Sequence, residues 1–95
     1  MELESSKVEK YLEITERALA KLRIMAPERS HSNKIAKDFL NMAESYYNDA
    51  THFFKEGNLV NAFACVNYAH GWLDAGARLG VFEVGEDDQL FTLME

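Results

Sequence analysis

The feature that most constrains the fold is a two-residue link between two long helical patterns. Apolar residues recur at three- and four-residue steps across residues 32–56, and the same spacing returns across residues 59–79. Such a period predicts an amphipathic helix in each segment. Between them stand Gly57, which suits the left-handed position that closes a helix, and Asn58, which suits the cap of the next one. So short a link forces the two helices to lie antiparallel and in contact.

A third helical pattern precedes this hairpin and covers residues 6–25. Pro27 ends it, because proline removes a backbone donor and disfavours helical geometry in the residue before it. With 95 residues the chain has room for one core only, so residues 1–95 form a single domain. The sequence therefore predicts an all-α protein, a three-helix antiparallel up-down-up bundle with a C-terminal extension.

The last helical pattern is apolar nearly all round. Only Asp74 and Arg78 are charged between residues 59 and 79, and a helix of this kind is central to its domain. Gly71 and Gly76 lie within it, although glycine inside a helix costs about 1 kcal/mol relative to alanine. We attribute both glycines to a neighbouring helix whose backbone comes close.

The C-terminal extension, residues 81–95, is an acidic tail with five acidic residues and no basic one. Its apolar residues Leu90, Phe91 and Leu93 either dock on the bundle or stay mobile until a partner offers a groove. We expect the chain up to Val84 to fold without the rest of the tail.

Composition and charge exclude several classes of function. The net charge is −6 and no basic face is apparent, whereas nucleic-acid binding needs basic groups that neutralise phosphates. No apolar run reaches the length of a membrane span, and the acidic start is unlike a signal peptide, so we expect a cytoplasmic protein away from membranes. The single Cys65 cannot form an internal disulfide or a cysteine-based zinc cage. No nucleophile suited to catalysis is evident, and we expect neither an enzyme nor a cofactor.

Polar residues on the last two helical patterns form the candidate site. His70 and Asp74 are neighbours at i and i+4, so their side chains can meet. Asp49 and His52 form a second carboxylate–imidazole pair on the preceding helix, and the antiparallel hairpin places Asp49 roughly level with His70. We therefore expect these groups to converge between the second and third helices.

Three interpretations of this cluster stay open. It can be a buried polar network that sets the register of the helices. It can be a ligand or partner surface, since aromatic residues with Arg are common anchors, and it would then use Tyr46, Asp49, Tyr68, His70, Trp72, Asp74 and Arg78. It can also be a metal site with Asp49, His52, His70 and Asp74 as ligands.

The sequence also resembles a known family. The run Tyr68-Ala69-His70-Gly71-Trp72-Leu73-Asp74-Ala75-Gly76, after Tyr46-x2-Asp49-Ala50-x2-Phe53-x2-Glu56-Gly57-Asn58, resembles the archaeal proteins grouped as domain of unknown function 357. The resemblance covers roughly residues 5–82 and is weakest in the first helix and the tail. It implies a small three-helix bundle and an archaeal source, and it implies no activity.

The function expected from these observations is a non-catalytic protein-interaction or binding module, whose partner is another protein or further copies of the chain. The alternative is a small metal- or ligand-binding protein that uses the His/Asp cluster between the second and third helices.

Overall fold

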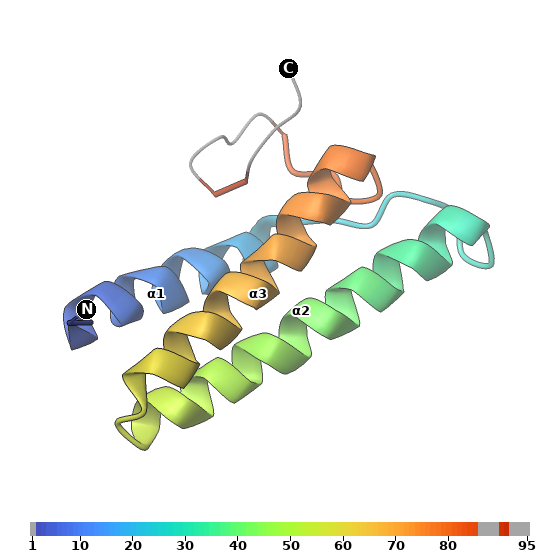
Figure 1. The fold of residues 1–95 in the computed structure, drawn as a ribbon. Coiled ribbons are helices and arrows are strands. Elements are labelled where there is room, and N and C mark those ends of the chain that lie inside the picture. Colours follow the sequence, from blue (N-terminus) through green and yellow to red (C-terminus); the bar gives the residue numbers. More distant parts are fainter. Residues whose placement is uncertain (1, 86–89, 92–95) are drawn as a thin grey trace.

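The fold is that of a computed structural model, in which residues 2–85, 90 and 91 are described. It consists of the helices α1 (Ser5–Lys21), α2 (His31–Lys55) and α3 (Leu59–Leu79). Figure 1 shows that α1 and α3 run in one direction and α2 in the other, with α3 in contact with both. The predicted all-α antiparallel bundle is confirmed. None of these helices is long and apolar enough to cross a membrane, as far as the described residues go.

Side chains cap the first turns of both α2 and α3. The Ser30 hydroxyl accepts a hydrogen bond from the Asn33 amide at 3.1 Å and caps α2. The Asn58 side chain accepts one from the Asn61 amide at 3.3 Å and caps α3. Gly57 has a φ of +78°, which a residue with a side chain rarely adopts, and this permits the reversal between α2 and α3.

The first helix is shorter than predicted, since it ends at Lys21 rather than near residue 25. Leu22 is already extended, and Arg23 forms an isolated antiparallel bridge with Glu83. Its two backbone hydrogen bonds measure 3.0 and 2.7 Å. Met25, which the pattern placed on the buried stripe, is 67% exposed. Pairing with the chain after α3 thus replaces the last helical turn, and proline 27 is not what ends the helix.

The hydrophobic core has two parts along the bundle. The part near the α2–α3 turn contains Val8, Leu12, Ala50, Ala62 and Val66. The part at the other end contains Ala18, Ala36, Ala43 and Leu73 together with Phe82, Val84, Leu90 and Phe91 from the tail. The tail therefore docks on the bundle at Leu90 and Phe91, whereas Leu93 lies outside the described residues. Phe91 is only 2% exposed, which is at odds with a chain that folds without the residues after Val84.

The two glycines of α3 have different surroundings, and neither is explained by a neighbouring helix. A Cβ atom at Gly76 would overlap the ring of Phe82, which folds back from the end of α3 onto the helix. A Cβ atom at Gly71 would meet no atom of the described residues within 4 Å, apart from the adjoining backbone of its own helix. The close approach expected from the sequence is thus wrong for Gly71, and at Gly76 it involves a side chain of the tail instead of a helix backbone.

Candidate functional site

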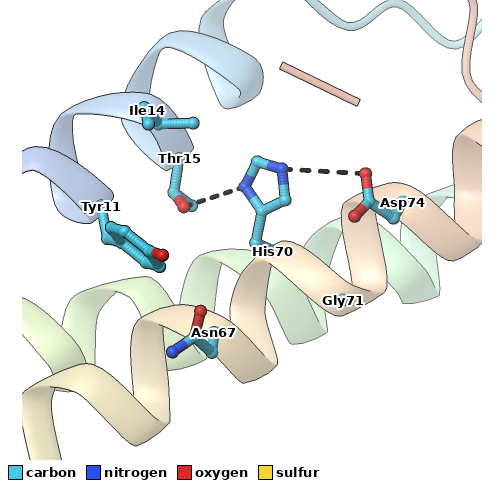
Figure 2. Close-up of a pocket in the computed structure, with 7 residues that line it drawn as sticks. All are labelled: Tyr11, Ile14, Thr15, Asn67, His70, Gly71 and Asp74. Carbon is cyan, nitrogen blue, oxygen red and sulfur yellow. Dashed lines mark hydrogen bonds and ion pairs between the residues drawn. The ribbon is translucent and has the colours of Figure 1, made fainter. Parts of the chain in front are cut away.

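His70 is the polar centre of the molecule, because its ring contacts three segments. Its Nδ1 atom lies 3.0 Å from the Thr15 hydroxyl of α1, and its Nε2 atom lies 2.6 Å from the Leu90 carbonyl oxygen of the tail. Asp74, one turn further along α3, lies 3.7 Å from the same Nε2 (Figure 2). A carbonyl oxygen can only accept, so Nε2 carries a proton, and in the neutral ring Nδ1 then accepts from the Thr15 hydroxyl.

Two of these partners, Thr15 and the Leu90 carbonyl, are absent from the site predicted from the sequence. Thr15 is 2% exposed, and the His70 ring provides its buried hydroxyl with a hydrogen-bond partner. The only signal for it in the sequence is its position, as a polar residue on the apolar stripe of the first helix. The contacts at His70 join α1, α3 and the tail, which supports the interpretation of His70 and Asp74 as a structural polar network.

A small open pocket lies beside His70, between α1 and α3. Its volume is about 220 Å³, and it is lined by Tyr11, Ile14, Thr15, Asn67, His70, Gly71 and Asp74 (Figure 2). This volume lies below the usual range of about 300–1,000 Å³ for ligand pockets. Only a small molecule would fit here, with an imidazole and a carboxylate on one wall and the Tyr11 ring on another.

The remaining polar residues of the predicted cluster lie elsewhere. His52 is exposed and pairs with Glu56 on its own helix, at 3.0 Å. Asp49 is exposed beside Cys65, and partial burial together with the negative charge of Asp49 raises the pKa of the Cys65 thiol. The predicted convergence of Asp49 and His52 with His70 is therefore wrong, since His70 faces α1 and the tail. Over residues 2–85, 90 and 91, no three His, Cys, Asp or Glu side chains could together hold a metal ion.

The aromatic residues of the predicted site do come together, along the seam between α2 and α3. The rings of Tyr46 and Tyr68 meet edge to face, with their centroids 4.4 Å apart, and Tyr68 lies 6.2 Å from Trp72. Trp72 in turn packs edge to face against Phe39 at 5.0 Å. Within the described part of the chain, the buried Nε1 atom of Trp72 has no hydrogen-bond partner. These contacts hold Tyr68 in place although half of it is exposed.

Tyr68 belongs to a continuous exposed surface that we call the outer face of α3. Helical spacing of three and four residues places its six members on one side of the helix, opposite the core: Val60, Ala64, Tyr68, Gly71, Ala75 and Leu79. Val60 is 70% exposed and Leu79 is 60% exposed. Arg78 is also exposed, near the C-terminal end of this face. The sequence indicated an apolar helix all round, and the structure shows that its second apolar side lies open.

These features define a class of protein: a small three-helix bundle that displays an apolar helix face and has a small pocket beside a half-buried histidine. The chain belongs to a family described as protein of unknown function (DUF357), whose model matches residues 10–82. This confirms the family resemblance seen in the sequence. Neither the curated proteins nor the solved structures include a significant match to the chain. Family membership therefore brings no activity with it, and the archaeal source remains an expectation.

Proposed function

We propose that this protein is a non-catalytic protein-interaction module and that the outer face of α3 is its binding surface. The observation that carries the proposal is the exposure of large apolar side chains on one face of the central helix, with Val60 at 70%, Leu79 at 60% and Tyr68 at 50%. Single exposed apolar residues are normal, whereas a contiguous apolar patch commonly marks an interaction site.

Gly71, in the middle of this face, supports the same conclusion. A glycine inside a helix lowers stability by about 0.5–1 kcal/mol relative to alanine. Among the described residues, nothing outside the adjoining backbone of α3 lies within 4 Å of the position that a Cβ atom at Gly71 would take, so this part of the fold does not require a glycine there. A partner helix that approaches closely at this point would require one.

The aromatic row beside the face provides suitable anchors. Tyr and Trp are enriched among the residues that dominate binding energy, and an anchor loses little entropy when its ring is already held. Tyr68 is held between Tyr46 and Trp72 and still presents half of its surface to solvent. The shallow hollow beside it, lined by Tyr68, Gly71, Trp72 and Ala75, can receive a side chain of the partner.

The proposal assigns no catalytic role to the polar groups. His70 uses both ring nitrogens to join α1 and the tail, and the raised pKa of Cys65 disfavours the reactive thiolate. The acidic chain, with a net charge of −6, is also poorly suited to bind nucleic acid. We place the module in the cytoplasm, away from membranes.

Photo-crosslinking in cells that naturally produce the protein tests this proposal. We would replace Tyr68 by benzoylphenylalanine and compare it with the same replacement at Asn41, an exposed residue on the outward side of α2. Illumination should give protein adducts from position 68 and few from position 41. The adduct mass and peptide map identify the bound protein. Adducts from position 41 alone, or from neither position, would contradict the proposal.

A second candidate function is small-ligand binding in the pocket at His70, which one observation favours. The pocket of about 220 Å³ brings together the imidazole of His70, the carboxylate of Asp74 and the ring of Tyr11. Adding a library of small polar molecules should then shift the NMR signals of Thr15, His70 and Asp74, with dissociation constants unaffected by changes at Val60. Shifts spread over the surface without saturation would argue against this function.

A further inference from the structure

We propose that the partner of the outer face of α3 is a second copy of this chain, packed with its α3 antiparallel to the first. The inference rests on the proposed function, because it names the occupant of the same surface. It adds that the two copies are related by a two-fold axis and that their α3 helices are aligned in one register. In that register Tyr68 of one copy covers Gly71 of the other.

The spacing of the outer face of α3 is self-complementary. Its six residues form three pairs, and the two members of each pair lie equally far along the sequence on either side of the midpoint between Ala69 and His70. The pairs are Tyr68 with Gly71, Ala64 with Ala75, and Val60 with Leu79. A two-fold axis that runs between two packed copies of α3, at the level of that midpoint, therefore brings each residue level with its pair in the other copy. The two-fold symmetric interface is the commonest in homo-oligomers and requires such a self-matching surface.

The sizes of the paired residues fit one another. The large ring of Tyr68 comes to lie over Gly71 of the second copy, which offers open space where a Cβ atom would stand. Ala64 and Ala75 then meet as two small residues, and this allows the helices to approach within the usual 8–10 Å between packed axes. At the ends, the exposed Val60 and Leu79 cover each other. The arrangement explains why glycine occupies the centre of the face.

Charge also favours a second copy at this surface. Most of the net charge of −6 lies in residues 81–95, which carry five acidic residues and no basic one, so two copies repel chiefly through their tails. Residues 58–80 contain one acidic and one basic residue, Asp74 and Arg78, so two copies can meet through this helix without net repulsion. The face carries a single charged side chain, Arg78 near its C-terminal end, which is too little charge to select a strongly acidic partner instead.

The size of the face sets the strength of the dimer. α3 has 21 residues, which corresponds to a length of about 30 Å. One pair of helices of this length buries less than the roughly 800 Å² per partner of a standard stable interface. We therefore expect a reversible dimer whose population rises with protein concentration.

The first test measures the molar mass by sedimentation equilibrium over a range of concentrations. The wild-type chain should approach twice its mass of 10.9 kDa. Gly71→Arg should weaken association at least about tenfold, because the long charged side chain occupies the place of Tyr68 from the second copy. This variant should fold, since its Cβ atom meets open space. Asn41→Arg adds the same charge on the exposed side of α2 and should dimerise like the wild type.

The second test measures the register in a Cys65→Ser background. A copy carrying Ala64→Cys is mixed with a copy carrying Ala75→Cys, and a short bismaleimide is added. The two different copies should crosslink to each other. Copies with Ala64→Cys alone should not, because their two thiols lie 11 residues apart, or about 16 Å along the helix axis. Efficient crosslinking of Ala64→Cys copies to one another would overturn the antiparallel register.

The outcomes separate this inference from the proposed function. A wild-type chain that stays monomeric at millimolar concentration, or a dimer that Gly71→Arg leaves intact, would overturn the inference. If the chain is monomeric and the benzoylphenylalanine at position 68 captures a different protein, the outer face of α3 is still a binding surface and only its occupant is wrong. If position 68 captures nothing and the chain is monomeric, both proposals are overturned.

Discussion

Replacing Phe91 by Ala should lower the free energy of unfolding by about 3–5 kcal/mol, the range observed for large aromatic residues in a core. Phe91 is 2% exposed, and no other fully buried side chain among the described residues is larger. It belongs to the same buried cluster as Leu73 of α3, Ala18 of α1 and Ala43 of α2, so its removal leaves a cavity in the part of the core to which all three helices contribute. Urea denaturation followed by circular dichroism measures the change, at a protein concentration low enough to keep the chain monomeric.

Met25→Ala is the matched control, because Met25 is an apolar side chain that is 67% exposed. We expect it to change the free energy of unfolding by no more than about 0.5 kcal/mol. An equal effect of the two substitutions would show that the residues after Val84 do not belong to the core. It would restore the sequence-based expectation of a bundle that folds without them.

The helices around the hairpin could be predicted because their signals are local. Gly57 and Asn58 need only their own backbone geometry and the nearest amides to close one helix and begin the next. The end of α1 depends instead on the pairing of Arg23 with Glu83, a residue 60 positions later in the chain. The spacing of apolar residues cannot reveal a contact between residues so far apart in the sequence. The prediction from that spacing therefore made the first helix about one turn too long.

Only part of the candidate site could be predicted, because the sequence does not fix how each helix is rotated about its axis. The antiparallel hairpin fixes the height of Asp49 relative to His70, but it does not fix which side of each helix faces the other. That rotation is set by the buried residues Val66 and Leu73, which direct His70 toward α1 and leave the aromatic seam with Tyr68 facing α2. The aromatic residues were therefore correctly grouped, whereas the expected convergence of Asp49 with His70 was wrong.

The alanine substitutions Gly71→Ala and Gly76→Ala should change stability in opposite directions, although both lie within the same helix. Gly71→Ala should raise the free energy of unfolding of the monomer by about 0.5–1 kcal/mol, because the new methyl group meets open space and restricts the unfolded chain. Gly76→Ala should lower it by about 1–3 kcal/mol, because the methyl group overlaps the buried ring of Phe82. Gly76→Leu should cost more. Urea denaturation of the dilute proteins measures all three changes.

A double-mutant cycle shows whether the Phe82 ring is the cause. Phe82→Leu alone should destabilise the protein, since Phe82 is 3% exposed. Combined with Gly76→Ala, it should cost less than the sum of the two single changes, because the smaller side chain leaves room for the methyl group. Strict additivity would show that Gly76 is needed for its backbone alone. A lower free energy of unfolding in Gly71→Ala would remove the argument that Gly71 is kept for a partner, since its cost to the monomer is what that argument requires.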